Sequence, residues 1–100
     1  MNIQDWRRKI DEIDRKLVRL LSQRAECSLA IGRLKRAAEI PLFHRKRERQ
    51  IAKNVRCANR GPLPDKSIQF LFEQILRVTR AAVRRALRPP KAGRATHRTQ

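Results

Sequence analysis

The amino-acid sequence predicts an all-α fold of three helices, in which the first helix is too long to be covered by its own chain. Apolar residues recur at intervals of three and four along three segments, which is the period of a helix that buries one face. Glycine and proline number only 3 and 5 among 100 residues, and most of them lie near positions 61–64 and 89–93. A chain of this length forms one small domain with a marginally stable core of its own.

The first predicted helix covers residues 5–38. Its apolar stripe is broken only at position 24 and consists of Ile3, Trp6, Ile10, Ile13, Leu17, Leu20, Cys27, Ile31 and Leu34. Such a helix is about 50 Å long, whereas a compact domain of this size has a radius of gyration of about 13 Å. Because the remaining chain supplies only two shorter helices, we expect a second copy of the first helix, in a homodimer, to cover the stripe.

Two shorter helices are predicted over residues 44–59 and 65–88. Pro41 marks the end of the first helix, since the residue before a proline is disfavoured in α geometry, and the segment 60–64 ends the second. Asp65 is the predicted N-cap of the third helix. Residues 1–88 thus make up the predicted helical domain, and residues 89–100, which are basic and lack periodicity, a disordered tail.

The formal charge of +17 predicts an anionic ligand without fixing its size, from nucleic acid to a small dicarboxylate. No stretch approaches the roughly 20 apolar residues of a membrane span, and the polar N-terminus differs from a signal peptide, so we expect a cytoplasmic protein without membrane contact. Cys27 and Cys57 lie far from any CxxC spacing and are expected to be buried free thiols. Neither a metal nor a cofactor is expected.

Four polar residues interrupt the inward-facing stripes of the three predicted helices. Arg24 stands where the repeat predicts an apolar residue, and a buried guanidinium is costly unless it meets an anion. Lys35 lies on the same helix, about 16 Å further along its axis and rotated by only about 20° about that axis from Arg24, so both cations share a face. Glu48 and Thr79 interrupt the second and third stripes. Taken singly, each residue has another explanation: a long side chain can extend to solvent, a charge can pair with a neighbour, and a hydroxyl can form a hydrogen bond with its own backbone. Taken together, the four residues predict one polar cavity that binds a small anion.

Arg7 lies on the same helix, seventeen residues before Arg24. That separation is about 25 Å, too far for both to hold one small ligand within a subunit. In an antiparallel pair of long helices, Arg7 of the second subunit can reach the cavity instead. Dimerisation then becomes a condition of function.

These residues lie in stretches that resemble the all-α chorismate mutases over about residues 3–87. The matching stretches are Arg7-Arg8-Lys9-Ile10-Asp11-Glu12-Ile13-Asp14, Leu20-Leu21-Ser22-Gln23-Arg24-Ala25-Glu26, Ile31-Gly32-Arg33-Leu34-Lys35, Pro41-Leu42-Phe43-His44-Arg45-Lys46-Arg47-Glu48 and Gly61-Pro62-Leu63. The resemblance implies three-helix protomers that exchange their first helices in an intertwined homodimer. It also implies an isomerase without cofactor, which rearranges chorismate to prephenate in the synthesis of phenylalanine and tyrosine.

The resemblance further implies the roles of single residues. Arg24, with Arg7 of the second subunit, would bind the substrate carboxylates, and Thr79 stands where a small hydroxyl residue commonly touches a carboxylate. Lys35 would donate to the ether oxygen. The Claisen rearrangement is concerted and needs no nucleophile, metal or general base. Fixed cations suit it because they hold the substrate folded and stabilise the charge that develops on the ether oxygen.

The remaining implied residues include one departure from the family. Glu48 would accept from the ring hydroxyl, Arg47 would add positive charge nearby, and His44 stands where the family often has Asp. Val83, however, occupies the place of a Gln or Glu that makes a second contact to the ether oxygen. By analogy with an oxyanion-hole donor, this loss corresponds to about 2.7–4 kcal/mol. Slow intrinsic turnover is therefore expected, unless another group or an activating partner enzyme of the same pathway reshapes the site.

Three other functions fit parts of the sequence. An isochorismate pyruvate-lyase shares the fold, although Glu48 favours the mutase. A basic nucleic-acid-binding protein is suggested by residues 44–49 and the basic tail, but no helix-turn-helix or aromatic stacking pattern supports it. A regulatory subunit with an inactive site remains open because of Val83.

Overall fold

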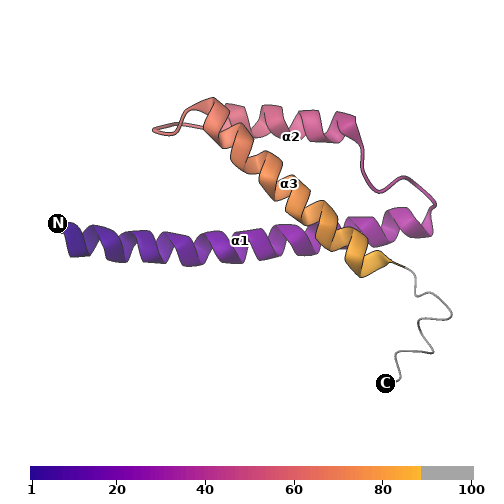
Figure 1. The fold of residues 1–100 in the computed structure, drawn as a ribbon, viewed down its shortest axis with the longest axis horizontal. Coiled ribbons are helices and arrows are strands. Elements are labelled where there is room, and N and C mark those ends of the chain that lie inside the picture. Colours follow the sequence, from indigo (N-terminus) through magenta and orange to yellow (C-terminus); the bar gives the residue numbers. More distant parts are fainter. Residues whose placement is uncertain (89–100) are drawn as a thin grey trace, which may run out of the picture.

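The computed structural model describes residues 1–88, which form three helices joined by two loops (Figure 1). They are α1, Ile3–Ala37; α2, Arg45–Ala58; and α3, Asp65–Leu87. The all-α class is thus confirmed, and each helix begins and ends within two residues of its expected bounds. The predicted tail, residues 89–100, lies outside the described residues.

α1 begins with a reciprocal cap that the sequence-based prediction missed. The backbone N–H of Asp5 donates to Asn2 Oδ1 at 2.9 Å, and the backbone N–H of Asn2 donates to Asp5 Oδ2 at 3.1 Å. This capping box satisfies N–H groups that lack helical partners, and it starts the helix two residues before the expected position. At its other end the chain leaves the helix through Glu39, whose φ is 57°.

The start of α3 corrects the expected cap. Pro64 is the N-cap, and Asp65 is the first helical residue. Asp65 Oδ1 instead accepts a hydrogen bond from the side chain of Asn59 at 2.8 Å, while the same Asn59 nitrogen donates to the carbonyl oxygen of Leu63 at 2.8 Å. The carboxylate therefore ties the end of α2 to the start of α3.

α3 runs diagonally from α2 to the second half of α1 and contacts both helices (Figure 1). It approaches α1 closely at Gly32, where an added Cβ would lie 2.9 Å from Leu87 Cδ1 and 3.0 Å from Val83 Cγ1. A glycine suits this close approach because any larger residue would have to push the side chains of Val83 and Leu87 aside. Among residues 1–88, Val83 is the one hydrophobic side chain that is buried, with 4% of its surface exposed.

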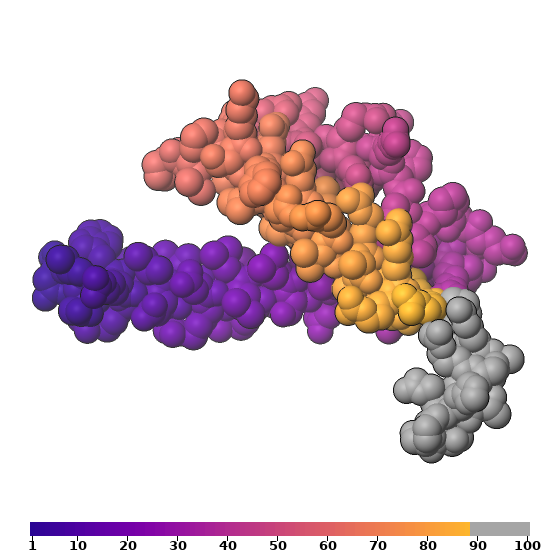
Figure 2. All heavy atoms as spheres, in the orientation of Figure 1, coloured from indigo at the N-terminus to yellow at the C-terminus, as the bar shows by residue number. Residues whose placement is uncertain are grey.

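The first half of α1 projects from the rest of the protomer as an arm (Figure 2). Residues 1–23 are exposed except for the half-buried Asp5. Their apolar stripe is 49–69% exposed at Ile3, Trp6, Ile10, Ile13, Leu17 and Leu20. The arm gives the chain a radius of gyration of 18.3 Å, well above the value of about 13 Å for a compact domain of this length.

Both cysteines are free, but they are exposed, so the prediction that they are buried is wrong for the protomer. Cys27 lies on α1 and Cys57 on α2, at positions that no other helix of the same chain covers. Within residues 1–88, none of the helices combines the length and the low polarity needed to cross a membrane.

Candidate functional site

A cavity of about 150 Å³ lies where α1, α2, α3 and the loop before α2 meet. Its polar lining consists of Arg24, Ser28, Lys35, His44, Arg47, Glu48, Thr79 and Arg80. Its other lining residues are Ile31, Gly32, Leu42, Phe43, Ile51, Leu76 and Val83. All the predicted site residues line this one cavity except Arg7. The structure thus brings together residues up to 59 positions apart, Arg24 and Val83 being the most distant pair.

α1 contributes the two cations that interrupt its apolar stripe. Arg24 and Lys35 are both half-buried, and they lie on one face of the helix on either side of Gly32 and Ser28. The Lys35 ammonium donates to the carbonyl oxygen of Leu42 at 3.3 Å. An ammonium carries three donors, so this bond fixes Lys35 at the cavity and leaves donors for a ligand.

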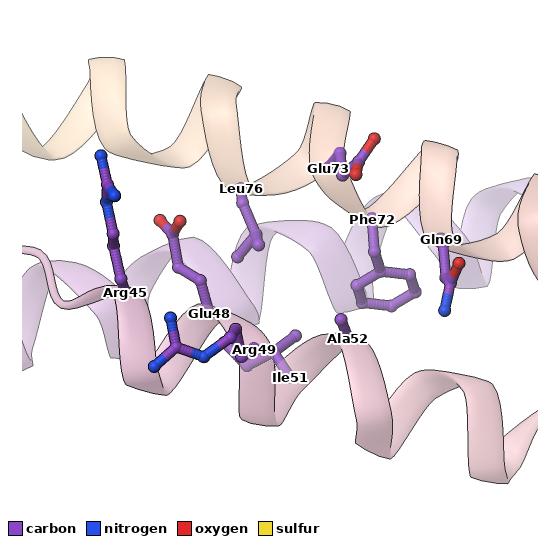
Figure 3. A pocket seen from close by; sticks show the side chains of 9 residues that line it. All are labelled: Arg45, Glu48, Arg49, Ile51, Ala52, Gln69, Phe72, Glu73 and Leu76. Atoms are coloured by element: carbon purple, nitrogen blue, oxygen red, sulfur yellow. The ribbon is translucent and has the colours of Figure 1, made fainter.

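α2 begins beside the cavity and presents its first turn to it. His44 is the N-cap residue and is exposed, and its side chain makes no capping hydrogen bond. Arg47 is also exposed, and its guanidinium donates to Gln50 Oε1 at 2.9 Å. Glu48 is half-buried and turns toward α3, as Figure 3 shows. Its carboxylate lies between the cavity and a groove on the outer side of α2 and α3, which Glu48, Ile51 and Leu76 also line.

α3 contributes Thr79, Arg80 and Val83 to the cavity. Thr79 is half-buried, whereas Val83 is packed against Gly32 of α1. Sequence reasoning missed Arg80, whose Nη1 atom forms an ion pair with Glu48 Oε2 across the two helices. The sequence-based alternative paired Glu48 with a neighbour on its own helix. The available signal for the true partner was an arginine next to the inward-facing Thr79.

Arg7 lies on the projecting arm of α1 and is exposed. It lines none of this cavity, as its distance from Arg24 along the helix required. Within its own protomer, Arg7 therefore has no access to a ligand held between Arg24 and Lys35.

The lining of the cavity selects for anions. It contains the cations Arg24, Lys35, Arg47 and Arg80 and the single carboxylate of Glu48. Apolar side chains on all three helices form the rest of the lining, and where they displace water the attraction between these cations and a bound anion is stronger. Several cations, a hydroxyl and a carboxylate together can hold a small dianion that also carries a hydroxyl group.

The residues of this cavity fall within a match to a known family. The family model described as Chorismate mutase type II matches residues 6–83. The chain belongs to the chorismate mutase type II family. This membership confirms the resemblance seen in the sequence, and it favours the mutase over both the lyase and the nucleic-acid-binding interpretations.

Solved structures support the assignment to the chorismate mutase type II family along most of the chain. The Form II structure of chorismate mutase from Thermus thermophilus has 34% identity and a TM-score of 0.80, and the match covers 83% of this chain and 94% of that one. The Form I structure from the same organism has 35% identity and a TM-score of 0.75, with 77% of this chain and 96% of that one covered.

Longer relatives carry the same family segment within a larger protein. The bifunctional chorismate mutase/prephenate dehydratase of Neisseria gonorrhoeae is 37% identical over 70 residues, which are 70% of this chain and 19% of that protein. The protein of the same name from Pseudomonas aeruginosa is 36% identical over 75 residues, or 70% and 20% of the two chains. This chain therefore spans about a fifth of the length of these relatives.

Proposed function

We propose that this chain catalyses the Claisen rearrangement of chorismate to prephenate in the cavity between its three helices. The observation that carries the proposal is the convergence of Arg24, Lys35, Glu48 and Thr79 from three helices on one cavity. Chorismate has two carboxylates, an ether oxygen and a ring hydroxyl, and this set of side chains offers a partner for each of them.

Each side chain has a defined task in the proposed reaction. Arg24 binds one carboxylate with its planar pair of donors, and Thr79 adds a hydroxyl donor to a carboxylate. One N–H of the Lys35 ammonium donates to the Leu42 carbonyl oxygen, and another donates to the ether oxygen of the substrate. Glu48 accepts from the ring hydroxyl.

The reaction needs no group transfer to the protein. As the C–O bond of the ether breaks, a C–C bond forms within the same molecule, so electrons and atoms balance without an added reagent. Negative charge develops on the ether oxygen in the transition state, where the fixed ammonium of Lys35 stabilises it more than in the ground state. Binding the enolpyruvyl arm folded over the ring lowers the entropic part of the barrier. His44 and Arg47 at the rim add a polar and a cationic contact.

We also propose that the active form is an intertwined homodimer. The arm of α1 exposes an apolar stripe along residues 3–20, and stable monomers rarely leave so large a continuous apolar surface in water. Charge supports the same partner. Residues 3–20 hold six cations and four carboxylates, whereas the rest of the chain holds 20 cations and five carboxylates. The net charge of the arm is therefore only +2, so two arms repel each other weakly although the chain as a whole is strongly basic.

In such a dimer, Arg7 of the partner subunit completes the cavity. The first half of α1, to which Arg7 belongs, extends past α2 and α3 (Figure 1). An antiparallel arm of the partner subunit would bring its own Arg7 toward Arg24 of this chain. This second guanidinium would bind the second carboxylate. An association with an enzyme that consumes prephenate is supported by the two bifunctional relatives, which join the same segment to a prephenate dehydratase. A cytoplasmic location remains a prediction from the sequence.

Prephenate formation by the purified chain tests this proposal. We expect the wild-type protein to convert chorismate and Arg24→Ala to lose about 100-fold or more in kcat/KM, since a misplaced substrate carboxylate disturbs the reacting geometry. Circular dichroism should show unchanged helicity, because Arg24 is half-buried at the cavity and packs into no core. Full activity in Arg24→Ala, or release of pyruvate from isochorismate without any prephenate from chorismate, would refute the proposal.

A further inference from the structure

The ion pair between Arg80 and Glu48 joins α3 to α2 at the cavity. The two residues are 32 positions apart, and both line the cavity. Their side chains are 31% and 32% exposed. Between residues 1 and 88, the structure has one other ion pair, which links Arg8 to Asp5 on the surface of α1. Among the described residues, the Arg80–Glu48 pair is therefore the only ion pair that joins two helices.

The pair engages one side of the Glu48 carboxylate. Arg80 Nη1 contacts Oε2, and no hydrogen bond to Oε1 is formed within the described part of the chain. Arg47, the adjacent cation on α2, is bonded to Gln50 instead. Glu48 thus has its cation on α3, and its second oxygen is available to accept a hydrogen bond from a ligand in the cavity.

Stability gives little reason for this pair. Ion pairs with this degree of exposure contribute about 0–1 kcal/mol, because solvent screens them and two long side chains lose rotamer freedom. Position gives a better reason. A glutamate side chain can adopt several rotamers, and Glu48 borders both the cavity and the outer groove seen in Figure 3, so its carboxylate can turn toward either. A cation on the opposite helix selects the rotamers that keep the carboxylate at the boundary of the cavity.

We propose that Arg80 is a positioning residue, which holds Glu48 so that Oε1 receives the ring hydroxyl of the substrate. Arg80 acts through Glu48 and has no direct contact with the substrate. The inference rests on the proposed function and assigns to α3 a role that neither Thr79 nor Val83 supplies. It predicts that the effect of Arg80 on turnover depends on the presence of the Glu48 carboxylate.

A double-mutant cycle in prephenate formation tests this dependence. Arg80→Met keeps the aliphatic stem and removes the guanidinium. We expect it to lower kcat/KM about tenfold or more, because small errors in the position of a reacting group are costly. In a Glu48→Gln background the same change should cost less than about threefold, since coupled residues are not additive. Arg80→Lys should restore most of the loss.

Arg77→Met is the matched control. Arg77 lies one turn before Arg80 on α3 and is bonded to Gln74 of its own helix. It lines a second surface groove together with Glu48 and Arg80, but within the described residues the ion pair of Glu48 is with Arg80, so removal of Arg77 lowers the charge equally and leaves that pair intact. We expect its kcat/KM to stay within about twofold of the wild type, as for surface changes elsewhere. Circular dichroism checks each fold, and Arg80→Gln replaces Arg80→Met if that variant loses helicity.

Each other outcome overturns the inference in a recognisable way. An equal loss from Arg80→Met in both backgrounds would mean a direct contact with substrate. A rise in activity would mean that the pair withholds Glu48 from the reaction, and an equal loss in Arg77→Met would mean a general effect of charge. Absence of prephenate formation by the wild type would overturn the proposed function itself, and this inference with it.

Discussion

Replacing Val83 with glutamine should make the enzyme faster and the protein less stable. Val83 lines the cavity and is 4% exposed, in the place where a second donor to the ether oxygen is missing. A Cβ added to Gly32 would lie only 3.0 Å from Val83 Cγ1, so a larger side chain at position 83 cannot extend toward α1. A longer side chain must turn into the cavity, where its amide can reach the ether oxygen beside Lys35.

The two effects have different sizes. One preorganised donor to a developing oxyanion is worth about 2.7–4 kcal/mol, or about two to three decades in rate, when its geometry is ideal. An amide placed without refinement realises part of this, so we expect kcat to rise about tenfold or more. In the free protein the same amide replaces a buried apolar side chain and lacks a partner, which should lower the free energy of unfolding by about 1–3 kcal/mol.

Steady-state formation of prephenate and urea unfolding measure both quantities. Val83→Met is the control, because it has a similar length and no amide donor, and it should leave kcat within about twofold of the wild type. A kcat for Val83→Gln that equals or falls below that of Val83→Met would refute the reasoning. The missing donor would then have no effect at this position, or another group of the site would already supply it.

Three further changes have defined outcomes. Gly32→Ala should lower the free energy of unfolding, measured by urea titration, by about 1 kcal/mol. Overpacking against Val83 and Leu87 costs about 1–3 kcal/mol, which exceeds the gain of about 1 kcal/mol from the higher helix propensity of alanine. A more stable variant would contradict the close approach of the two helices. Trp6→Asp should raise the dimer dissociation constant about 100-fold or more in sedimentation experiments, since each subunit loses about 1.5–3 kcal/mol of apolar burial; an unchanged constant would place Trp6 outside the interface. Raising the salt concentration from 0.01 to 0.15 M shortens the Debye length from about 30 to about 8 Å. Because this screening weakens the attraction of a dianionic substrate to the cavity, kcat/KM should fall more than kcat. Equal changes in the two quantities would argue against electrostatic attraction.

The helices were predictable because their signals are local. Spacing of apolar residues located α1, α2 and α3, and Pro41 and segment 60–64 located the breaks. The exceptions depended on side-chain geometry. Asn2 and Asp5 form a capping box that the apolar pattern does not contain, and Asp65 was expected as a cap although it bonds to Asn59.

The membership of the cavity was predictable for a different reason. Arg24, Lys35, Glu48 and Thr79 stand at positions where helical periodicity demands an apolar residue, and all four line one cavity. Arg80 could not be found in this way. It is adjacent to the stripe of α3, and its pairing with Glu48 depends on how α2 and α3 lie against each other. The exposure of Cys27 and Cys57 likewise depends on which faces another element covers, which periodicity alone does not reveal.

Mixing two inactive variants tests most directly whether each site is built from both chains. Arg7→Ala and Arg24→Ala are unfolded together and refolded, so that about half of the dimers carry one chain of each kind. In every mixed dimer, one cavity has its own Arg24 and an intact Arg7 from the other chain, while the second cavity lacks both. The account predicts recovery of about a quarter of the wild-type activity in the mixture. Activity that stays at the level of the separate variants would contradict it.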